Sequence, residues 1–243
     1  MKNKRPSISV VIPTLNEEKY LSRCLESFTK QTYKNFETII SDGHSTDNTV
    51  NIAKKYKATV VINPHPTIPS ARQKGVEASS GEIIIGADAD TYYPSTHIEY
   101  IVEDFLKDQH IVAVVGGARF PAHPWWIHLG WKTVYSISAL LSKVGIVGYF
   151  PAFNFSFRKD AFDKIGGYNT YIDYGGDELD LRNRLEKAGK IIYDPRLSPL
   201  SSNRRTKVGF FRFVFKEGLI DYYLSYVLAK IFKRPIITGK PVR

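Results

Sequence analysis

The 243-residue sequence is poor in cysteine, methionine and uninterrupted apolar runs, and these shortages narrow the classes of protein it can belong to. Cys24 is the single cysteine, so an internal disulfide framework is excluded, which fits a reducing compartment. Its place on the apolar face of a predicted helix favours packing over catalysis. No secretory signal precedes the first predicted strand, so we expect a cytoplasmic location. The six histidines lack metal-ligand spacing, and none is assigned to a metal.

Acidic residues are scarce near the C-terminus, where positive charge gathers. The net charge is +10, and residues 204–243 hold ten Lys or Arg against Glu217 and Asp221. Apolar residues recur there at helical spacing, with basic residues on the other faces. Such a helix suits an anionic membrane interface. The alternative is that the helix packs against the folded domain that precedes it. We expect a domain over residues 1–205 and a basic amphipathic helical tail over 206–243, peripheral on the cytoplasmic face of the membrane.

A second aromatic segment lies at residues 124–150. It contains all three tryptophans around an apolar stretch that Lys132 and Lys143 interrupt, so it does not predict a membrane span. The pattern fits an interfacial helix with aromatic anchors or an ordinary amphipathic helix on the sheet.

Apolar strand patterns alternate with helical patterns along the first 200 residues. This alternation predicts an α/β fold, with a mostly parallel sheet joined by right-handed crossovers. The expected strands are residues 8–12, 36–41, 59–62, 83–85, 111–115, 153–157 and 191–193.

Two carboxylates directly follow the apolar run at residues 83–85. Side chains alternate on an extended chain, so Asp88 and Asp90 point the same way and small Ala89 faces the other. Open α/β sheets bind ligands at the carboxyl ends of their strands, and paired hard oxygens suit Mg²⁺ or Mn²⁺. A solvated turn is the alternative interpretation of these two acids.

Acidic residues also open two predicted helices. Asn16 is a suitable N-cap, with Glu17 and Glu18 in the first turn. Asp177–Leu185 reads as a helix with acids at its start, preceded by two glycines. The strand at 153–157 alternates as if it were half-buried.

Six ordered motifs stand out along the chain. They are VIPTLNE (11–17), DGHSTD (42–47), ARQKG (71–75), DAD (88–90), NFSFR with GGY (154–158 and 166–168), and DELDLRNRL (177–185). Together they resemble the family 2 glycosyltransferases, inverting enzymes of the GT-A fold that use nucleotide sugars. The resemblance covers nearly all of residues 8–205. It strengthens the metal-site interpretation of Asp88 and Asp90 over that of a solvated turn.

The resemblance implies roles for individual residues. Asp42 is implied to read the base, Arg72 to approach the diphosphate, and Asp90, with or without Asp88, to hold Mn²⁺ or Mg²⁺. The implied donor-binding set is Pro13, Thr14, Glu17, Asp42, Arg72 and Asp88. Asn154, Arg204 and Arg205 are assigned to the acceptor or to a phosphate, with a membrane-facing basic patch as the alternative for the two arginines.

The acidic helix departs from the family pattern. The family commonly reads Glu-Asp there, whereas this chain has Asp177-Glu178. Glu178 takes the place of the usual base, and Asp177 serves instead if the backbone shifts by one residue. The choice between the two stays open.

These residues predict transfer of a hexosyl group from a UDP- or GDP-sugar to an acceptor hydroxyl, on a glycan or a lipid-linked acceptor, by metal-assisted direct displacement. A sugar-phosphate nucleotidyltransferase is one alternative, but the loop at residues 13–17 lacks the glycines usual in that class. A nucleic-acid-binding protein that uses the basic tail is the other. The acids of the expected cleft argue against nucleic acid, because they repel phosphate unless metal is present.

Overall fold

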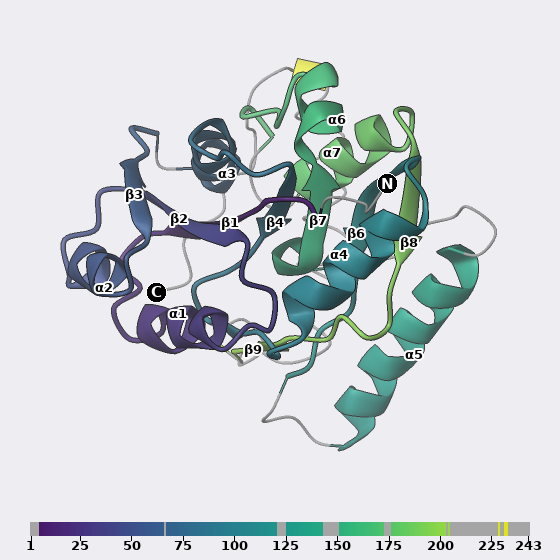
Figure 1. Ribbon diagram of the computed structural model, residues 1–243, viewed down its shortest axis with the longest axis horizontal. Helices are drawn as coiled ribbons and strands as arrows, with labels where there is room; N and C mark the ends of the chain where they lie inside the picture. The colour runs from purple at the N-terminus through teal and green to yellow at the C-terminus, as the bar shows by residue number, and fades with distance from the viewer. Residues whose placement is uncertain are drawn as a thin grey trace.

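The computed structural model describes residues 5–65, 67–120, 125–142, 151–172, 176–202, 204, 228 and 231–232 (Figure 1). Of the expected tail, only Leu228, Ile231 and Phe232 are among them, so the division at residue 205 stays a prediction.

A seven-stranded sheet forms the centre of the molecule, in the order β3-β2-β1-β4-β7-β6-β8. All strands run parallel except β7, which is antiparallel to both of its neighbours, so the prediction of a mostly parallel sheet is confirmed. A two-stranded sheet pairs β5 with β9. The strands are β1 Ile8–Thr14, β2 Phe36–Asp42, β3 Thr59–Ile62, β4 Ile83–Gly86, β5 Thr91–Tyr92, β6 Ile111–Val115, β7 Phe155–Arg158, β8 Lys190–Tyr193 and β9 Leu200–Ser201.

Helices cover both faces of the large sheet (Figure 1). Apolar residues of α1 Leu21–Thr29, α2 Thr49–Lys55 and α4 His97–Lys107 join one core cluster. Those of α3 Ile68–Glu77, α6 Lys159–Lys164 and α7 Asp177–Leu185 join the other. Strand β4 shows why both faces need cover, because Ile83 and Ile85 enter the first cluster and Ile84 the second.

Strand β7 corrects one expectation. A 3-10 helix, Ala152–Asn154, takes up the start of the predicted strand, and β7 begins at Phe155. Phe155, Ser156 and Phe157 are all buried, so the prediction of a half-buried strand was wrong. The reason is position, since β7 lies between β4 and β6 inside the sheet and has core on both faces.

The first helix also begins later than predicted. α1 starts at Leu21 after Tyr20, so Asn16 is not its N-cap. Asn16 instead takes a positive φ of 56° in the loop after β1, and its side-chain oxygen accepts a hydrogen bond from the Thr46 amide. Asparagine tolerates this left-handed conformation better than most residues do.

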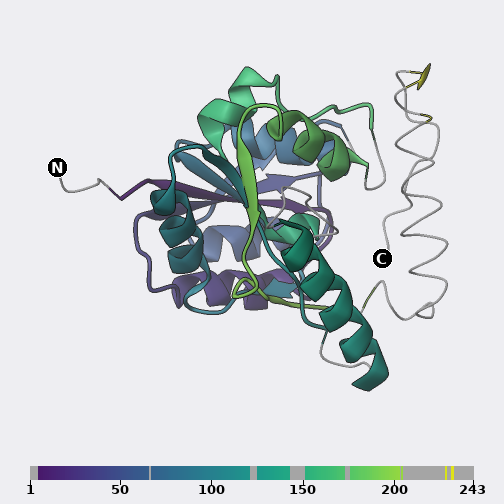
Figure 2. The ribbon, with the colours of Figure 1, turned by 90° about the vertical axis from the view of Figure 1, so that its right-hand side faces the viewer.

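Helix α5 Trp125–Ser142 projects beyond the body of the molecule (Figure 2). Trp131 is buried against Phe120, whereas exposed apolar side chains stand elsewhere along the helix. No helix within the described residues is both long and apolar enough to cross a membrane. Among the α5 side chains that the structure describes, the exposed apolar ones are Leu129, Val134, Ile137 and Leu140.

A strap, defined as residues 194–202 together with Arg204, leads from the end of β8 to the carboxyl edge of the sheet. The Gly117 amide donates to the Leu197 carbonyl at 2.9 Å, and the Ser202 amide donates to the Asp90 carbonyl at 3.2 Å. The strap is therefore held at its middle and at its far end, which fixes where its last residue lies.

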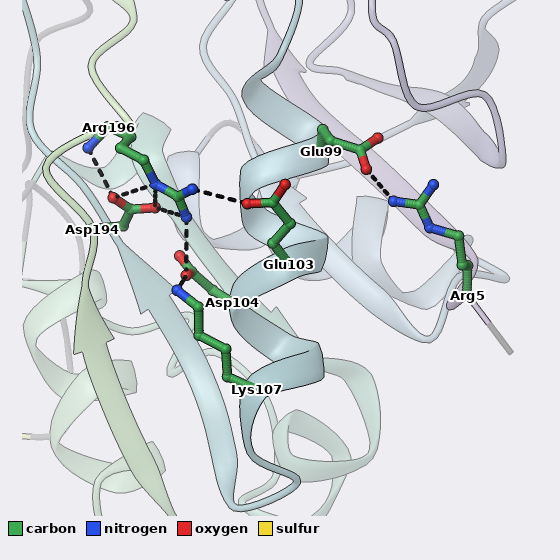
Figure 3. Close-up of polar contacts among 7 residues, drawn as sticks. All are labelled: Arg5, Glu99, Glu103, Asp104, Lys107, Asp194 and Arg196. Atoms are coloured by element: carbon green, nitrogen blue, oxygen red, sulfur yellow. Dashed lines mark hydrogen bonds and ion pairs between the residues drawn. The ribbon is translucent and has the colours of Figure 1, made fainter. Parts of the chain in front are cut away.

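Arg196 anchors the near end of the strap (Figure 3). Its guanidinium forms ion pairs with Asp194 at 2.8 Å, Glu103 at 2.8 Å and Asp104 at 3.2 Å. It also lies 4.3 Å from the ring centre of Tyr100. A planar fork with five donors suits such a site, because it can serve several carboxylates at once.

Candidate active site

The carboxyl ends of β1, β2 and β4 meet at one edge of the sheet. β1 ends at Thr14 and β2 at Asp42, which face each other in register. β4 ends at Gly86, two residues before Asp88. The acids predicted from the sequence therefore gather at the edge where open α/β sheets bind ligands.

The turn that carries Asp88 and Asp90 is fixed from beneath. The Asp88 amide donates to the Tyr93 hydroxyl at 3.1 Å, and that hydroxyl donates to the Phe153 carbonyl at 3.0 Å. The buried thiol of Cys24 contacts the Asp88 carbonyl oxygen at 3.4 Å, in agreement with its predicted packing role. Both carboxylates are therefore held at the edge by a buried support.

Helix α3 brings Arg72 to the site. Gly75 allows this helix to approach β1 closely, since a Cβ there would lie 2.3 Å from the Val11 Cγ1. Arg72 is only 7% exposed, and its Nη2 lies 3.6 Å from Asp88 Oδ1. The guanidinium therefore reaches the first carboxylate of the predicted metal pair.

The same arginine also holds the acidic start of α7. Its Nη1 lies 2.9 Å from Asp177 Oδ2 and forms a second ion pair with Glu178. Asp177 is 1% exposed and Glu178 is 7% exposed. Both candidate bases thus share one buried cation, which the sequence gave no reason to expect.

Burial and the neighbouring charges shift the pKa values of Asp177 and Arg72. Burial, followed by the adjacent Glu178 carboxyl, raises the pKa of Asp177 well above its usual value, and Arg72 opposes the rise. Burial works against the charge of Arg72, yet Glu178 and Asp177 raise the pKa of Arg72 above its already high value. The arginine stays charged, and Asp177 holds a proton more tightly than a free carboxyl does.

The strap carries a second arginine to Asp90. Arg204 Nε lies 3.0 Å from Asp90 Oδ2, and Ser202 Oγ also donates to that oxygen. Arg204 Nη1 lies 2.9 and 3.0 Å from the two carboxylate oxygens of Glu17, and its guanidinium lies 4.7 Å from the ring centre of Tyr20. Burial raises the pKa of Glu17, and Arg204 opposes that rise.

The loops after β1 and β2 are bonded to each other around Asp42. Asp42 Oδ1 accepts from the hydroxyls of Thr14 at 2.9 Å and Ser45 at 2.6 Å, and Oδ2 accepts from the Ser45 amide at 2.8 Å. The Glu17 amide donates to the Thr49 hydroxyl at 2.7 Å. Within the described part of the chain, these three hydrogen bonds use three of about four acceptor positions on the Asp42 carboxylate and leave one on Oδ2.

The remaining predicted residues lie in different surroundings. Pro13 is half-buried within β1. Asn154 is 1% exposed, and its amide donates to the carbonyls of Gly117 at 2.7 Å and Leu197 at 2.9 Å, which favours a structural role in holding the strap. Arg205 lies outside the described residues.

The chemistry of this edge suits a divalent cation that is shared with a substrate. Asp88 and Asp90 offer hard oxygen ligands, and Mg²⁺-type sites often combine one or two carboxylates with water and substrate phosphates. Among the described residues, no group of three or more His, Cys, Asp or Glu side chains is placed to hold a metal ion. The residues present fit an ion held jointly with a diphosphate rather than by a closed protein cage.

Residues 9–166 match the model of the family described as Glycosyl transferase family 2, so the chain belongs to the family 2 glycosyltransferases. It is 31% identical over 117 residues to a hyaluronan synthase of Pasteurella multocida, which covers 46% of this chain and 12% of that protein. It is 25% identical over 227 residues to an O-antigen chain rhamnosyltransferase of Salmonella anatum, covering 88% of this chain and 72% of that one. This chain thus spans only a small part of some curated relatives.

Solved structures place the fold among the GT-A transferases. A mannosyltransferase from Pyrobaculum calidifontis, in complex with GDP-Man and Mn²⁺, superposes with a TM-score of 0.77 at 19% identity, over 99% of this chain and 67% of that one. A glucosyl-3-phosphoglycerate synthase from Mycobacterium tuberculosis gives a TM-score of 0.64 at 20% identity, over 95% and 81%. These similarities confirm the GT-A fold predicted from the motifs.

Two features of the site were missed by sequence reasoning. The pairing of Arg72 with Asp177 joins residues 105 positions apart, and no local pattern signals it. The strap was also not predicted, although its arginines, Arg196 and Arg204, are visible in the sequence. A signal was available in the excess of acids at the site, since buried carboxylates require a nearby cation.

Proposed function

We propose that this protein is an inverting glycosyltransferase that moves a sugar from a nucleoside-diphosphate sugar to an acceptor hydroxyl by direct displacement. The observation that carries the proposal is the continuous row of charges at the sheet edge. It runs from Asp177 and Glu178 through Arg72 to Asp88, and from Asp90 through Arg204 to Glu17. One end holds candidate bases and the other holds a candidate diphosphate site.

The leaving group is a diphosphate, so the main catalytic need is to neutralise developing negative charge. Asp88 and Asp90 are the residues that would hold Mn²⁺ or Mg²⁺, which supplies Lewis-acid stabilisation when bound. Arg72 and Arg204 add two guanidinium groups beside them, a group suited to bidentate contact with phosphate oxygens.

Either Glu178 or Asp177 activates the acceptor hydroxyl. A carboxylate here removes the proton from the acceptor hydroxyl as the sugar is transferred, and general base catalysis typically supplies about 10²–10⁴-fold in rate. The raised pKa of Asp177 favours this role, because a stronger base is obtained when burial disfavours the anion. Glu178 is the more exposed of the two and so is easier for a hydroxyl to reach.

The nucleotide lies, in this proposal, against the loops after β1 and β2. The free acceptor position on Asp42 Oδ2 serves a donor N–H of the base, with Pro13 and Thr14 beside it. Uracil and guanine both present such an N–H, so the site is compatible with a UDP- or a GDP-sugar. Glu17 then lies next to the ribose and diphosphate, where its pairing with Arg204 keeps it ordered.

A peripheral position at the membrane is part of the same proposal. The exposed apolar residues of α5, such as Leu129, Ile137 and Leu140, suit contact with a lipid surface, and the basic tail suits anionic lipid on the cytoplasmic face. A lipid-linked or glycan acceptor would be reached there. Vesicle flotation tests this part: binding to anionic but not neutral vesicles supports it, and no binding to either contradicts it.

A thermal-shift panel of nucleotide sugars, with and without Mn²⁺, tests donor and metal together. We expect one nucleotide class to raise the melting temperature, and Mn²⁺ to increase that shift. Product analysis separates the alternatives, because a glycosyltransferase releases nucleoside diphosphate and a nucleotidyltransferase produces or consumes pyrophosphate. A gel shift with nucleic acid and no response to any nucleotide sugar would overturn the proposal.

A further inference from the structure

Arg204 lies against one oxygen, Oδ2, of the Asp90 carboxylate that the proposed metal would use. Its Nε lies 3.0 Å from Asp90 Oδ2, and its Nη1 lies 2.9 Å from Glu17 Oε2. The side chain is 23% exposed, compared with 8% for Arg72. Arg204 thus acts as a cation inside the site, but one at its solvent-facing side.

A divalent ion and this guanidinium cannot both lie against Asp90 Oδ2 without strong repulsion between like charges. The guanidinium of Arg204 can move away from Asp90 at a modest cost in free energy, because partly exposed ion pairs contribute little to stability. Its backbone is nevertheless held by the strap, with the Ser202 amide bonded to the Asp90 carbonyl. A displaced guanidinium therefore stays close to the site and remains available to another anion.

We propose that Arg204 couples metal binding to diphosphate binding. Without metal, its guanidinium balances Asp90 and Glu17; when the ion binds Asp90, the guanidinium is released and pairs with the donor diphosphate. This inference rests on the proposed function, since it requires metal and nucleotide at this edge. It adds that the metal alone binds weakly, because it competes with Arg204, and that the diphosphate removes this competition.

Thermodynamic linkage makes the coupling measurable from either ligand. If nucleoside diphosphate strengthens Mn²⁺ binding by some factor, Mn²⁺ strengthens nucleotide binding by the same factor. Removing Arg204 must then have two opposite effects: tighter binding of Mn²⁺ alone, and a smaller gain when nucleotide is added. A residue that only supports the fold would weaken both.

The test measures Mn²⁺ binding by the loss of the free-ion electron paramagnetic resonance signal, which requires no acceptor. Wild type, Arg204→Gln and Arg5→Gln are titrated with Mn²⁺ alone, then with UDP or GDP, whichever raises the melting temperature. Arg5 is the matched control, because this exposed side chain pairs with Glu99 away from the candidate site and its loss changes the net charge equally. We expect Arg204→Gln to bind Mn²⁺ alone about 5-fold or more tightly than wild type, and to lose a similar factor of the nucleotide-dependent gain.

The outcomes separate this inference from the proposed function. If wild type binds Mn²⁺ with nucleotide but Arg204→Gln binds Mn²⁺ alone no more tightly than wild type, the inference is wrong and the function stands. An equal tightening in Arg5→Gln would mean a general charge effect and would also overturn it. If Asp90→Asn binds Mn²⁺ as well as wild type under every condition, the metal step of the proposed function fails, and the coupling fails with it.

Discussion

Arg72 and Arg204 are the two arginines of the candidate site, and they hold their carboxylates in different surroundings. Arg72 is buried on α3 and pairs with Asp177, Glu178 and Asp88. Arg204 is partly exposed at the end of the strap and pairs with Asp90 and Glu17. The same guanidinium chemistry therefore serves a permanent contact at one end of the row and a replaceable one at the other.

The difference follows from desolvation. A buried ion pair is costly to break, because the partner that remains keeps its charge without water. A partly exposed pair is cheap to break, since water replaces the lost partner. In the proposed mechanism, the site combines a fixed acid cluster for the acceptor with an exchangeable cation for the donor.

The largest expected effect is on turnover, at the acids that Arg72 holds. Glu178→Gln or Asp177→Asn, made singly, is expected to lower turnover by about 10²–10⁴-fold, because in the proposed mechanism one of these carboxylates removes the acceptor proton. Release of nucleoside diphosphate is the measurement. Glu186→Gln, at the other end of α7, is the control and should retain wild-type turnover. Wild-type turnover in both single variants would contradict the assignment of the base.

The second effect is on stability, at Arg72 itself. Arg72→Met leaves Asp177 and Glu178 buried without their cation, which is expected to cost about 3–5 kcal/mol of unfolding free energy at neutral pH. The loss should shrink as the pH falls, because the raised pKa of Asp177 lets that carboxyl take up a proton and lose its charge. Urea unfolding at about pH 7.5 and pH 5 measures both. Arg158→Met is the control: its side chain bonds the carbonyls of Ile111 and Phe105, so its cost should not depend on pH in this way.

Much of the fold was predictable because its signals are local. The strand at Ile111–Val115 has the predicted bounds, since a run of β-branched residues and alanine between two polar segments needs no tertiary information. The alternation of strands and helices was enough to predict a mostly parallel sheet. The position of Asp88 and Asp90 just beyond the end of β4 was predictable, because a local apolar run precedes them, whereas their metal role stays a prediction.

The predictions that the structure corrects concern features that depend on contacts between segments far apart in the sequence. The direction and burial of β7 follow from its place between β4 and β6, which no property of its own residues reveals. Asn16 has the composition of an N-cap, but hydrogen bonds to the loop after β2 place it differently. Arg72 was expected at the diphosphate alone, and its pairing with the acids of α7 appears only in the folded chain.

The third effect is on the pH dependence of stability, at Asp104, which pairs with Arg196 at the near end of the strap. Burial, and then the neighbouring Asp194, raise the pKa of Asp104 to about 6, although Lys107 and Arg196 lie against it (Figure 3). Folded protein then binds a proton more tightly than the unfolded chain, so this acid makes stability fall as pH rises from about 4 to 6. Asp104→Asn should remove that slope, worth about 1–3 kcal/mol, in unfolding curves across this range.

Exposed Asp163→Asn serves as the control for the Asp104 experiment, since Asp163 only pairs with Lys159 at the surface. It should leave the pH dependence of unfolding as in wild type. An Asp104→Asn variant with the wild-type slope between about pH 4 and 6 would show that Asp104 does not retain its proton there.

The smallest effect is expected at Arg204. Arg204→Met breaks pairs with Asp90 and Glu17, as Arg72→Met does with its acids, but the partly exposed location should limit the cost to about 0–1 kcal/mol. Added salt should reduce that cost further, because screening weakens partly exposed charge pairs. Urea unfolding of the two Met variants, side by side at low and high salt, measures the contrast directly. Equal losses in the two variants would mean that Arg204 is a structural cation like Arg72, and that it cannot be released when a metal ion binds.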